Sequence, residues 1–166
     1  MSGHSVRRLG VADAAAFRDI RLDGLERHPE AFGASLEIER DQPPAFFEGR
    51  LRDNAIFGGF DVDGDLVGVA GLRVDASPKT RHVATFWGMY VQDQARRTGL
   101  ARRLVQAALD AVPADCRSVR LSVVSTNAAA IGLYQSFGFT TWALDVEALR
   151  VGGRYYDEVL MRLDLE

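Results

Sequence analysis

Residues 95–109 read ARRTGLARRLVQAAL, and they follow closely on the apolar run FWGMYV of residues 86–91. The apolar run predicts a mostly buried strand. Downstream, the spacing predicts a helix that Pro113 ends and whose apolar face holds Leu100, Leu104, Ala107, Ala108 and Ala111. A strand, a short turn and a helix therefore form the unit from which we work outward.

The turn in this unit predicts a binding site for an anion. The first amides of a helix are unpaired and carry the positive end of its dipole, and Gly99 and Ala101 let a ligand come close to them. Positive charge around the turn comes from Arg96, Arg97, Arg102 and Arg103. A phosphate or pyrophosphate is the favoured ligand. The alternative is that Gly99 only eases the turn and the arginines form a solvated surface.

Two common phosphate-binding loops do not fit this turn. A nucleotide triphosphatase loop needs the pattern GxxxxGK[ST], and neither its lysine nor its spacing is present. A dinucleotide-binding fold needs GxGxxG early in the chain, and this turn has one of those glycines. Nucleotide hydrolysis and nicotinamide chemistry are therefore disfavoured.

The segments on either side predict a mixed sheet with helices. Residues 118–124 predict a second buried strand, and residues 127–139 predict a helix that Asn127 or Thr126 caps, so the two central strands pair in parallel. Further strands are predicted around 6–9, as a hairpin over 55–74, and as a second hairpin over 141–165. Two helices joined by a loop are expected between Asp13 and Leu51.

Length and composition predict one soluble domain, residues 1–166, in the cytoplasm. Twenty basic and 23 acidic side chains give a net charge of -3, which argues against nucleic acid as a partner. No apolar run is long enough to span a membrane, and the N-terminus lacks the core of a signal peptide. The single cysteine, Cys116, excludes an internal disulfide and is interpreted as ordinary packing. DVDGD at 61–65 predicts a hairpin turn rather than a calcium loop, because position 72 is Leu, and no metal is expected.

Residues 84–139 resemble the GNAT superfamily of acyl-coenzyme A dependent N-acetyltransferases. The family pattern Q/R-x-x-G-x-G/A, which bears the coenzyme pyrophosphate, is met by Arg96, Gly99 and Ala101. Its second pattern, N-x-x-A-x-x-L-Y-x-x-x-G-F, is met by Asn127, Ala130, Leu133, Tyr134, Gly138 and Phe139. The resemblance implies an α+β fold with a central mixed, mostly antiparallel sheet, a splayed parallel strand pair and about four flanking helices.

The resemblance also implies acetyl-CoA as co-substrate, direct attack by an amine in a ternary complex, and no metal. The residues it places against the coenzyme are Met89, Tyr90, Val91, Arg96, Arg97, Thr98, Gly99, Leu100, Ala101, Arg102, Asn127 and Tyr134. By family analogy the backbone N–H of Val91 polarises the thioester carbonyl, and the hydroxyl of Tyr134 protonates the leaving thiolate. Tyr134 also lies on an apolar helical stripe and Asn127 also suits a helix cap, so both are predicted to have two roles.

The amine acceptor and the general base are less determined. An aromatic pocket with nearby carboxylates, suited to a cationic amine, is predicted from Phe32, Glu37, Trp87 and Tyr155. The strand before the turn has no carboxylate, so His82, Glu37, Glu39, Asp157 and Glu158 are considered as the base and none is assigned. A small-molecule amine is the preferred acceptor, with a peptide N-terminus or lysine as the alternative. A non-catalytic acyl-CoA binding regulatory domain is the rival class, and a homodimer is possible by family analogy.

Overall fold

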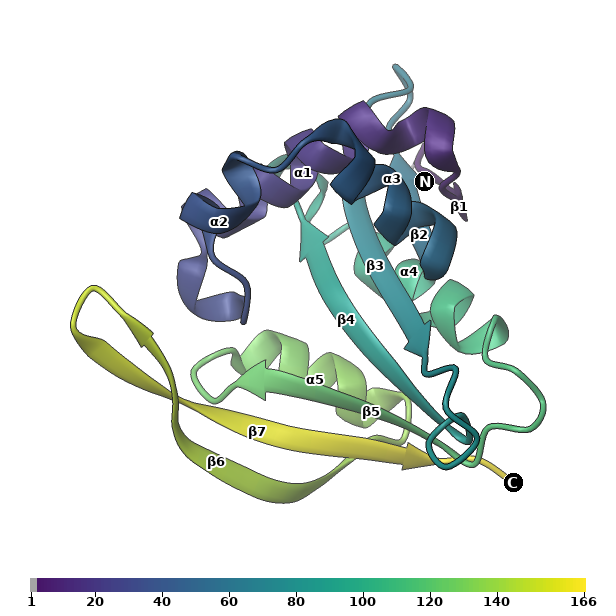
Figure 1. Cartoon of the computed structure of the whole chain (residues 1–166), viewed down its shortest axis with the longest axis vertical. Coiled ribbons are helices and arrows are strands. Elements are labelled where there is room, and N and C mark those ends of the chain that lie inside the picture. The colour runs from purple at the N-terminus through teal and green to yellow at the C-terminus, as the bar shows by residue number, and fades with distance from the viewer. Residues whose placement is uncertain (1–2) are drawn as a thin grey trace.

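A computed structural model of the chain describes residues 3–166 and contains one seven-stranded sheet with the order β1-β2-β3-β4-β5-β7-β6. The strands are β1 (Ser5–Arg8), β2 (Ala55–Phe60), β3 (Leu66–Val74), β4 (Val83–Val91), β5 (Ser118–Val124), β6 (Thr140–Val151) and β7 (Arg154–Asp164). The pair β4–β5 is parallel, and the other neighbours are antiparallel (Figure 1). The predicted mixed, mostly antiparallel sheet is confirmed.

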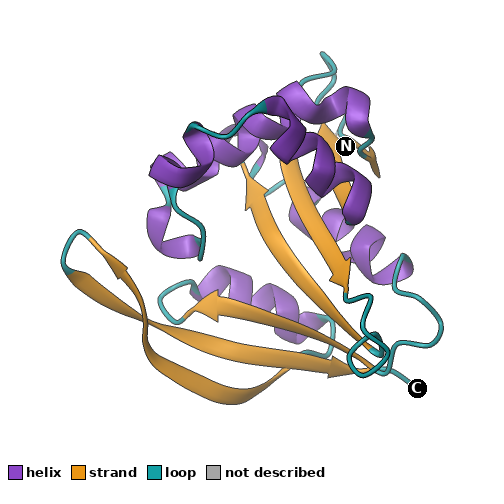
Figure 2. Cartoon of the chain, in the orientation of Figure 1, coloured by secondary structure: helices purple, strands orange, loops and turns teal. Residues whose placement is uncertain are grey.

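Five α-helices pack on the sheet: α1 (Ala14–Arg27), α2 (Leu36–Arg40), α3 (Pro44–Asp53), α4 (Leu100–Asp110) and α5 (Ala128–Ser136). The first three lie together over one face of the sheet, and α4 and α5 lie behind it (Figure 2). A loop was expected where α2 lies. This helix has only five residues, too few for a helical period to be visible in the sequence.

Two apolar clusters fill the space between the helices and the sheet. One packs α1 and α3 on the strands around Phe17, Phe47 and Ile56, and the other packs α4 and α5 around Leu104 and Met161. Apolar side chains alternate along the strands, so that successive residues supply the two faces. The turn before α4 and the helix itself are therefore backed by the apolar core.

The two central strands separate soon after they begin. Their parallel register covers only the pairs Val83↔Ser118, Ala84↔Val119 and Thr85↔Arg120. Beyond Thr85 the strands diverge (Figure 1). A β-bulge lies on the far part of β4, where the register with β3 shifts between Val69 and Gly71 and where Gly88 has a φ of 67°. The bulge bends β4 and leaves one of its edges open to a ligand.

Both predicted hairpins are present. In the β2–β3 turn, Oδ1 of Asp61 accepts hydrogen bonds from the amides of Asp63 and Asp65, so DVDGD closes a turn on itself. Gly152 and Gly153, both at positive φ, form the β6–β7 turn. Within residues 3–166, no helix is long and apolar enough to cross a membrane.

Candidate active site

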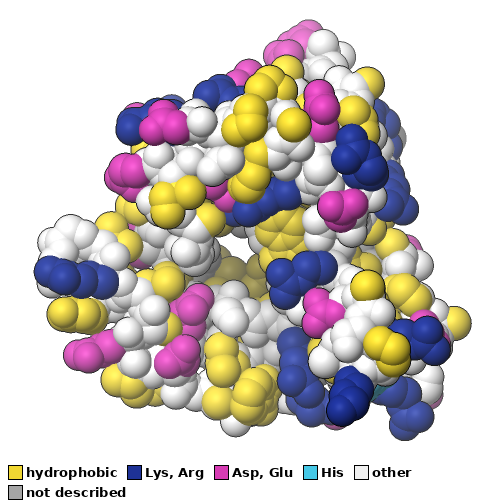
Figure 3. Space-filling model, in the orientation of Figure 1, with side chains coloured by type: hydrophobic (Ala, Val, Ile, Leu, Met, Phe, Trp, Pro, Cys, Tyr) yellow, Lys and Arg dark blue, Asp and Glu magenta, His cyan; other side chains and the backbone are white. Residues whose placement is uncertain are grey.

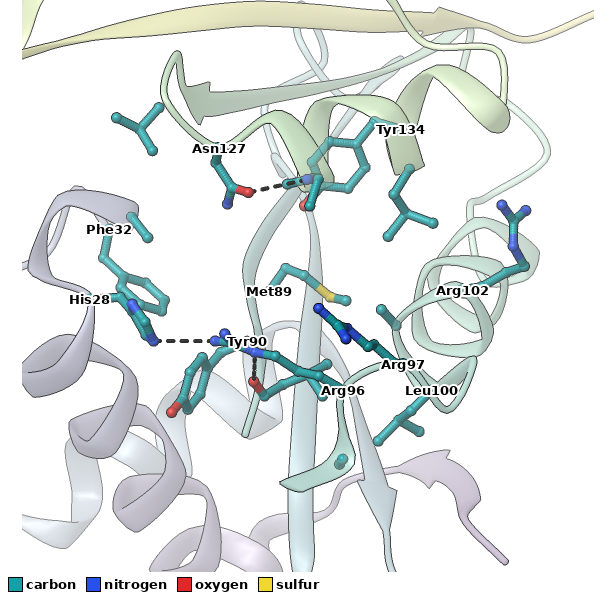
Figure 4. A pocket seen from close by; sticks show the side chains of 18 of the residues that line it. His28, Phe32, Met89, Tyr90, Arg96, Arg97, Leu100, Arg102, Asn127 and Tyr134 are labelled. Atoms are coloured by element: carbon teal, nitrogen blue, oxygen red, sulfur yellow. Dashed lines mark hydrogen bonds between the residues drawn. The ribbon is translucent and has the colours of Figure 1, made fainter. Parts of the chain in front are cut away.

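A cavity of about 760 Å³ opens between β4, the turn before α4 and the first turn of α5 (Figure 4). It gathers most of the residues that the sequence predicts for the coenzyme: Met89, Tyr90, Val91, Arg96, Arg97, Gly99, Leu100, Ala101, Arg102, Asn127 and Tyr134. Residues from three separate parts of the chain thus meet at one site. Thr98 is the one predicted coenzyme residue that does not line it.

The open edge of β4 supplies backbone groups to this cavity. The amide of Gln92 donates to the carbonyl of Val67 on β3, at 2.9 Å. Because neighbouring residues of a strand point their backbone groups to opposite sides, the N–H and C=O of Val91 point away from β3. In agreement, the Val91 carbonyl accepts a hydrogen bond from Nε of Arg96 at 3.1 Å. The Val91 N–H therefore lies on the edge where β5 has moved away.

The turn before α4 is shaped for close approach to its backbone. Gly99 caps the helix in the left-handed region, with φ 83° and ψ 1°, and no other part of the protein comes within 4 Å of the place a Cβ would take. Arg97 also has a positive φ, 60°. Oγ1 of Thr98 donates to the carbonyl of Ala95 at 2.6 Å, which closes the turn. Thr98 therefore shapes the turn from within.

The four arginines around the turn do different things. Arg103 donates to the backbone carbonyl of His4 at 2.6 Å and does not line the cavity, whereas the other three arginines do. Arg102 donates to Oγ of Ser136 at 2.9 Å. Arg97 has no ion pair or hydrogen bond from its side chain to any residue in 3–166, and its guanidinium reaches into the cavity (Figure 4). Arg97 is thus the cation with most freedom to meet a phosphate.

Arg96 connects the turn to the end of α1. Its guanidinium contacts Oδ1 of Asp93 at 3.1 Å and Nε2 of His28 at 3.2 Å (Figure 4). An arginine only donates hydrogen bonds, so this contact needs His28 with its Nε2 unprotonated. Sequence reasoning missed His28, since the residue stands alone in RHPEAF and its partner is 68 positions away.

Tyr134 combines a buried ring with a place on the cavity wall. The residue is 5% exposed, and its ring packs edge-on against Phe86 and Phe139, with centroids 5.7 and 6.0 Å away. Burial raises the pKa of its hydroxyl above the ordinary value, so the group stays protonated at neutral pH. Asn127 caps α5, because its Oδ1 accepts from the amide of Ala130 at 3.1 Å, and it lines the cavity too.

A smaller cavity of about 100 Å³ lies where β4 and β5 diverge. Phe32 and Trp87, both predicted to bind the acceptor, line it together with Gly88. Glu37 and Tyr155, predicted for the same role, line neither of these cavities. The side chain of Glu37 is exposed and accepts from Oγ of Ser35, and Tyr155 is 53% exposed beside the β6–β7 turn. These four residues were grouped in one predicted pocket because of their residue types. In the structure Glu37 lies on α2 and Tyr155 lies on the β6–β7 hairpin, away from Phe32 and Trp87.

A buried group of charges lies behind Phe32 and Trp87. Glu39, only 2% exposed, accepts from Nε and Nη2 of Arg21 at 2.8 and 3.1 Å, and Nη1 of Arg50 lies 2.9 Å from its Oε1. Two guanidiniums occupy this carboxylate, so Glu39 is not available as a base. Burial, and then repulsion from Arg21, lower the pKa of Arg50.

The other side chains considered as the base lie apart from the two cavities. His82 is exposed and precedes β4, at the end where β4 and β5 are paired. Asp157 accepts from the amide of Glu147 at 2.8 Å. Glu158 faces Asp145 across β6–β7, and burial, then repulsion from Asp145, raise the pKa of its carboxyl. Cys116 is buried in the core, and burial also raises the pKa of its thiol, which fits a packing role.

Comparison with known proteins gives consistent matches. A model described as the acetyltransferase (GNAT) family matches residues 18–139. The chain is 28% identical to an L-methionine sulfoximine/L-methionine sulfone acetyltransferase of Pseudomonas paraeruginosa, over 98% of this chain and 95% of that one. It is 29% identical to an L-amino acid N-acetyltransferase of Escherichia coli, over 97% and 98%. An acetyltransferase of Salmonella typhimurium, solved with its cofactor acetyl-CoA, has a TM-score of 0.81 and 24% identity, over 99% and 95%.

Proposed function

The chain belongs to the acetyltransferase (GNAT) family, and from this premise we propose that it transfers the acetyl group of acetyl-CoA to a primary amine of a small molecule. One observation carries the proposal: a single cavity joins the amides and arginines of the α4 turn to the open edge of β4. The first feature suits a pyrophosphate, and the second suits an extended chain bearing amides. Coenzyme A has both groups in that order, because its pyrophosphate is followed by the pantetheine chain with its two amides.

The residues of the turn bind and orient the co-substrate in this proposal. Gly99 and the first amides of α4 receive the pyrophosphate, and Arg97 adds charge-assisted hydrogen bonds. Acetyl-CoA supplies an acetyl group already activated as a thioester. The Val91 N–H then donates to the carbonyl oxygen of that thioester, where negative charge develops as the amine attacks.

Tyr134 holds the proton that the departing thiolate takes up. Burial holds the pKa of this hydroxyl above its ordinary value, so the group is protonated at neutral pH and donates a hydrogen bond, and with it the proton, to the departing thiolate. The ring is held by Phe86 and Phe139, so the hydroxyl has a defined position on the cavity wall. Asn127 and residues 28–32 also border this cavity, on the side that we assign to the acceptor. We refer to residues 28–32 as the lid.

A small acceptor is favoured by the position of this lid. The 3-10 helix Pro29–Ala31 lies against β5 and β6, so the lid crosses from the helical half of the molecule to the other half. An acceptor then reaches the site through the restricted space at Phe32 and Trp87. A peptide N-terminus or a lysine is the second candidate, and the relatives named for amino-acid-like acceptors favour the first.

The proposal is tested by measuring thiol release from acetyl-CoA in the presence of amines, polyamines, amino acids, aminoglycosides and peptides, with calorimetric binding of coenzyme A beside it. Amine-dependent thiol release with a small acceptor is the expected result. Tight coenzyme binding without release for any acceptor would instead support the non-catalytic regulatory domain.

A further inference from the structure

Arg21 is a buried residue that keeps one unused hydrogen-bond donor. The residue lies on α1 and is 6% exposed, and its Nε and Nη2 are taken by Glu39. Its third nitrogen, Nη1, has no hydrogen-bond partner among residues 3–166. A buried guanidinium usually satisfies its donors, since an unpaired one loses its hydration without compensation. Nη1 of Arg21 is not among the fully buried polar atoms that lack a partner, so it reaches accessible space and is free to meet a ligand.

The charge around Arg21 is also unbalanced. Arg21 and Arg50 share the single carboxylate of Glu39, so this group, in which the Arg50 side chain is 28% exposed, carries one excess positive charge. One arginine, held by two parallel hydrogen bonds, is enough to pair a carboxylate. The second cation, Arg50, is destabilised by loss of hydration and by repulsion from Arg21, and both effects lower its pKa. An anion bound next to this group would reduce that destabilisation.

The unused donor lies beside the acceptor cavity. Nη1 of Arg21 is 3.3 Å from the place that a Cβ on Gly88 would take, and Gly88 lines the cavity of about 100 Å³ with Phe32 and Trp87. The Arg21 guanidinium carbon lies 5.7 and 5.3 Å from the ring centroids of Phe32 and Trp87. Nε1 of Trp87 is a buried donor without a partner within the described chain. That indole nitrogen packs against Gly71 of β3, so Nη1 of Arg21 is the donor that lies beside this cavity, next to the bulge of β4.

We propose that Nη1 of Arg21 binds the carboxylate of the acceptor, which is therefore an amine that also carries a carboxylate, as an amino acid does. The proposal rests on the proposed acetyltransferase function and adds the residue that selects the acceptor. Charges of both signs border the cleft. Figure 3 shows basic side chains at the helical border of the central hollow and acidic side chains on its β6–β7 side, where basic side chains also lie.

The experiment compares pairs of acceptors that differ only in the carboxylate. Thiol release is measured for L-methionine, L-leucine and L-phenylalanine, each beside its decarboxylated amine. If a charge-assisted hydrogen bond holds the carboxylate, then for each amino acid that is a substrate kcat/KM should exceed that of its matched amine by about tenfold to a hundredfold. Equal values for amino acid and amine would overturn the carboxylate proposal and leave the acetyltransferase in place. The wild-type protein suffices for this step.

Variants then assign the effect to Arg21. Arg21→Gln should bring the ratio of amino acid to amine close to one, while Arg50→Gln, which also removes a partner of Glu39, should keep it. A purely structural role would lower kcat/KM for both members of each pair alike, and so would leave the ratio unchanged. Calorimetric binding of coenzyme A to each variant confirms that the fold survives. If Arg21→Gln does not fold, Arg21→Lys keeps the charge and should still reduce the ratio, because it lacks the third nitrogen.

Calorimetry of amino acid binding to the coenzyme A complex separates the two proposals. Amino acid binding that Arg21→Gln weakens, without thiol release, would retain the carboxylate site and reject the acetyltransferase. The absence of amino acid binding and of any preference in turnover would reject the carboxylate site.

Discussion

Replacing Gly99 by Ala tests the coenzyme site most directly, and the chain offers a matched control. Gly99 has a φ of 83°, and Gly64 in the β2–β3 turn has a φ of 86°, and no other part of the protein lies within 4 Å of a Cβ at either place. Both substitutions therefore meet the same backbone strain and no clash. A left-handed residue other than glycine costs about 1–2 kcal/mol. For a chain of this length that lowers Tm by roughly 2–8 °C in either variant.

The two variants should differ in binding. The methyl group at position 99 would enter the space over the first amides of α4, whereas Gly64 does not line the cavity. A phosphate displaced from these amides loses one or two charge-assisted hydrogen bonds, each about 1.5–3 kcal/mol. The affinity for coenzyme A should then fall at least about tenfold for Gly99→Ala. It should stay within about twofold of wild type for Gly64→Ala.

Thermal unfolding and isothermal calorimetry with coenzyme A measure the two effects separately. Similar losses in Tm with a loss of affinity only in Gly99→Ala are expected. Wild-type affinity in Gly99→Ala, at a Tm matching that of Gly64→Ala, would refute the placement of the pyrophosphate at this turn. Gly99→Glu, which also adds negative charge, should remove binding completely.

Three further predictions concern single side chains. Tyr134→Phe should lower kcat by about 10²–10⁴ and change acetyl-CoA affinity little, as steady-state kinetics and calorimetry would show; an unchanged kcat would return Tyr134 to a packing role only. Glu158 has a folded pKa above its unfolded value, so its contribution to stability is present at low pH and is lost as pH rises through the folded pKa. Glu158→Gln should therefore raise Tm more at about pH 7 than at about pH 4, and equal shifts in thermal scans would contradict the assigned cause. Phe47→Ala, at a side chain that is 0% exposed, should lower the free energy of unfolding by about 3–5 kcal/mol in urea titrations, and a loss below about 1 kcal/mol would mean that the core closes the void.

The residues predicted for the coenzyme meet in one cavity, and the features that pointed to them in the sequence are local. A glycine at positive φ, small neighbours and the first amides of a helix lie within a few residues, and Gly99, Leu100 and Ala101 all line the cavity. Asn127 was predicted as a cap for the same reason, and it is one. Hairpin turns and helix ends are likewise set by neighbouring residues.

The acceptor end depended on contacts between residues far apart in the chain. Whether Glu37 or Glu39 is buried follows from how α2 sits on α1, and a five-residue helix shows no period that would reveal it. The contact between His28 and Arg96 spans 68 positions. Arg103 has the same charge as its neighbours in sequence, but it faces His4 because of where β1 lies.

The family, the order of all helices and strands except α2, and the turn before α4 could thus be read from the amino-acid sequence. Backbone conformation and helix capping depend on residues that are neighbours in the sequence, so both can be predicted from the sequence. Three properties became visible in the three-dimensional structure: which charges face the cleft, the free donor of Arg21 beside Gly88, and the open edge of β4 from Phe86 onward. Those properties arise from the packing of distant segments, where a side chain's burial and partners are set by the whole fold.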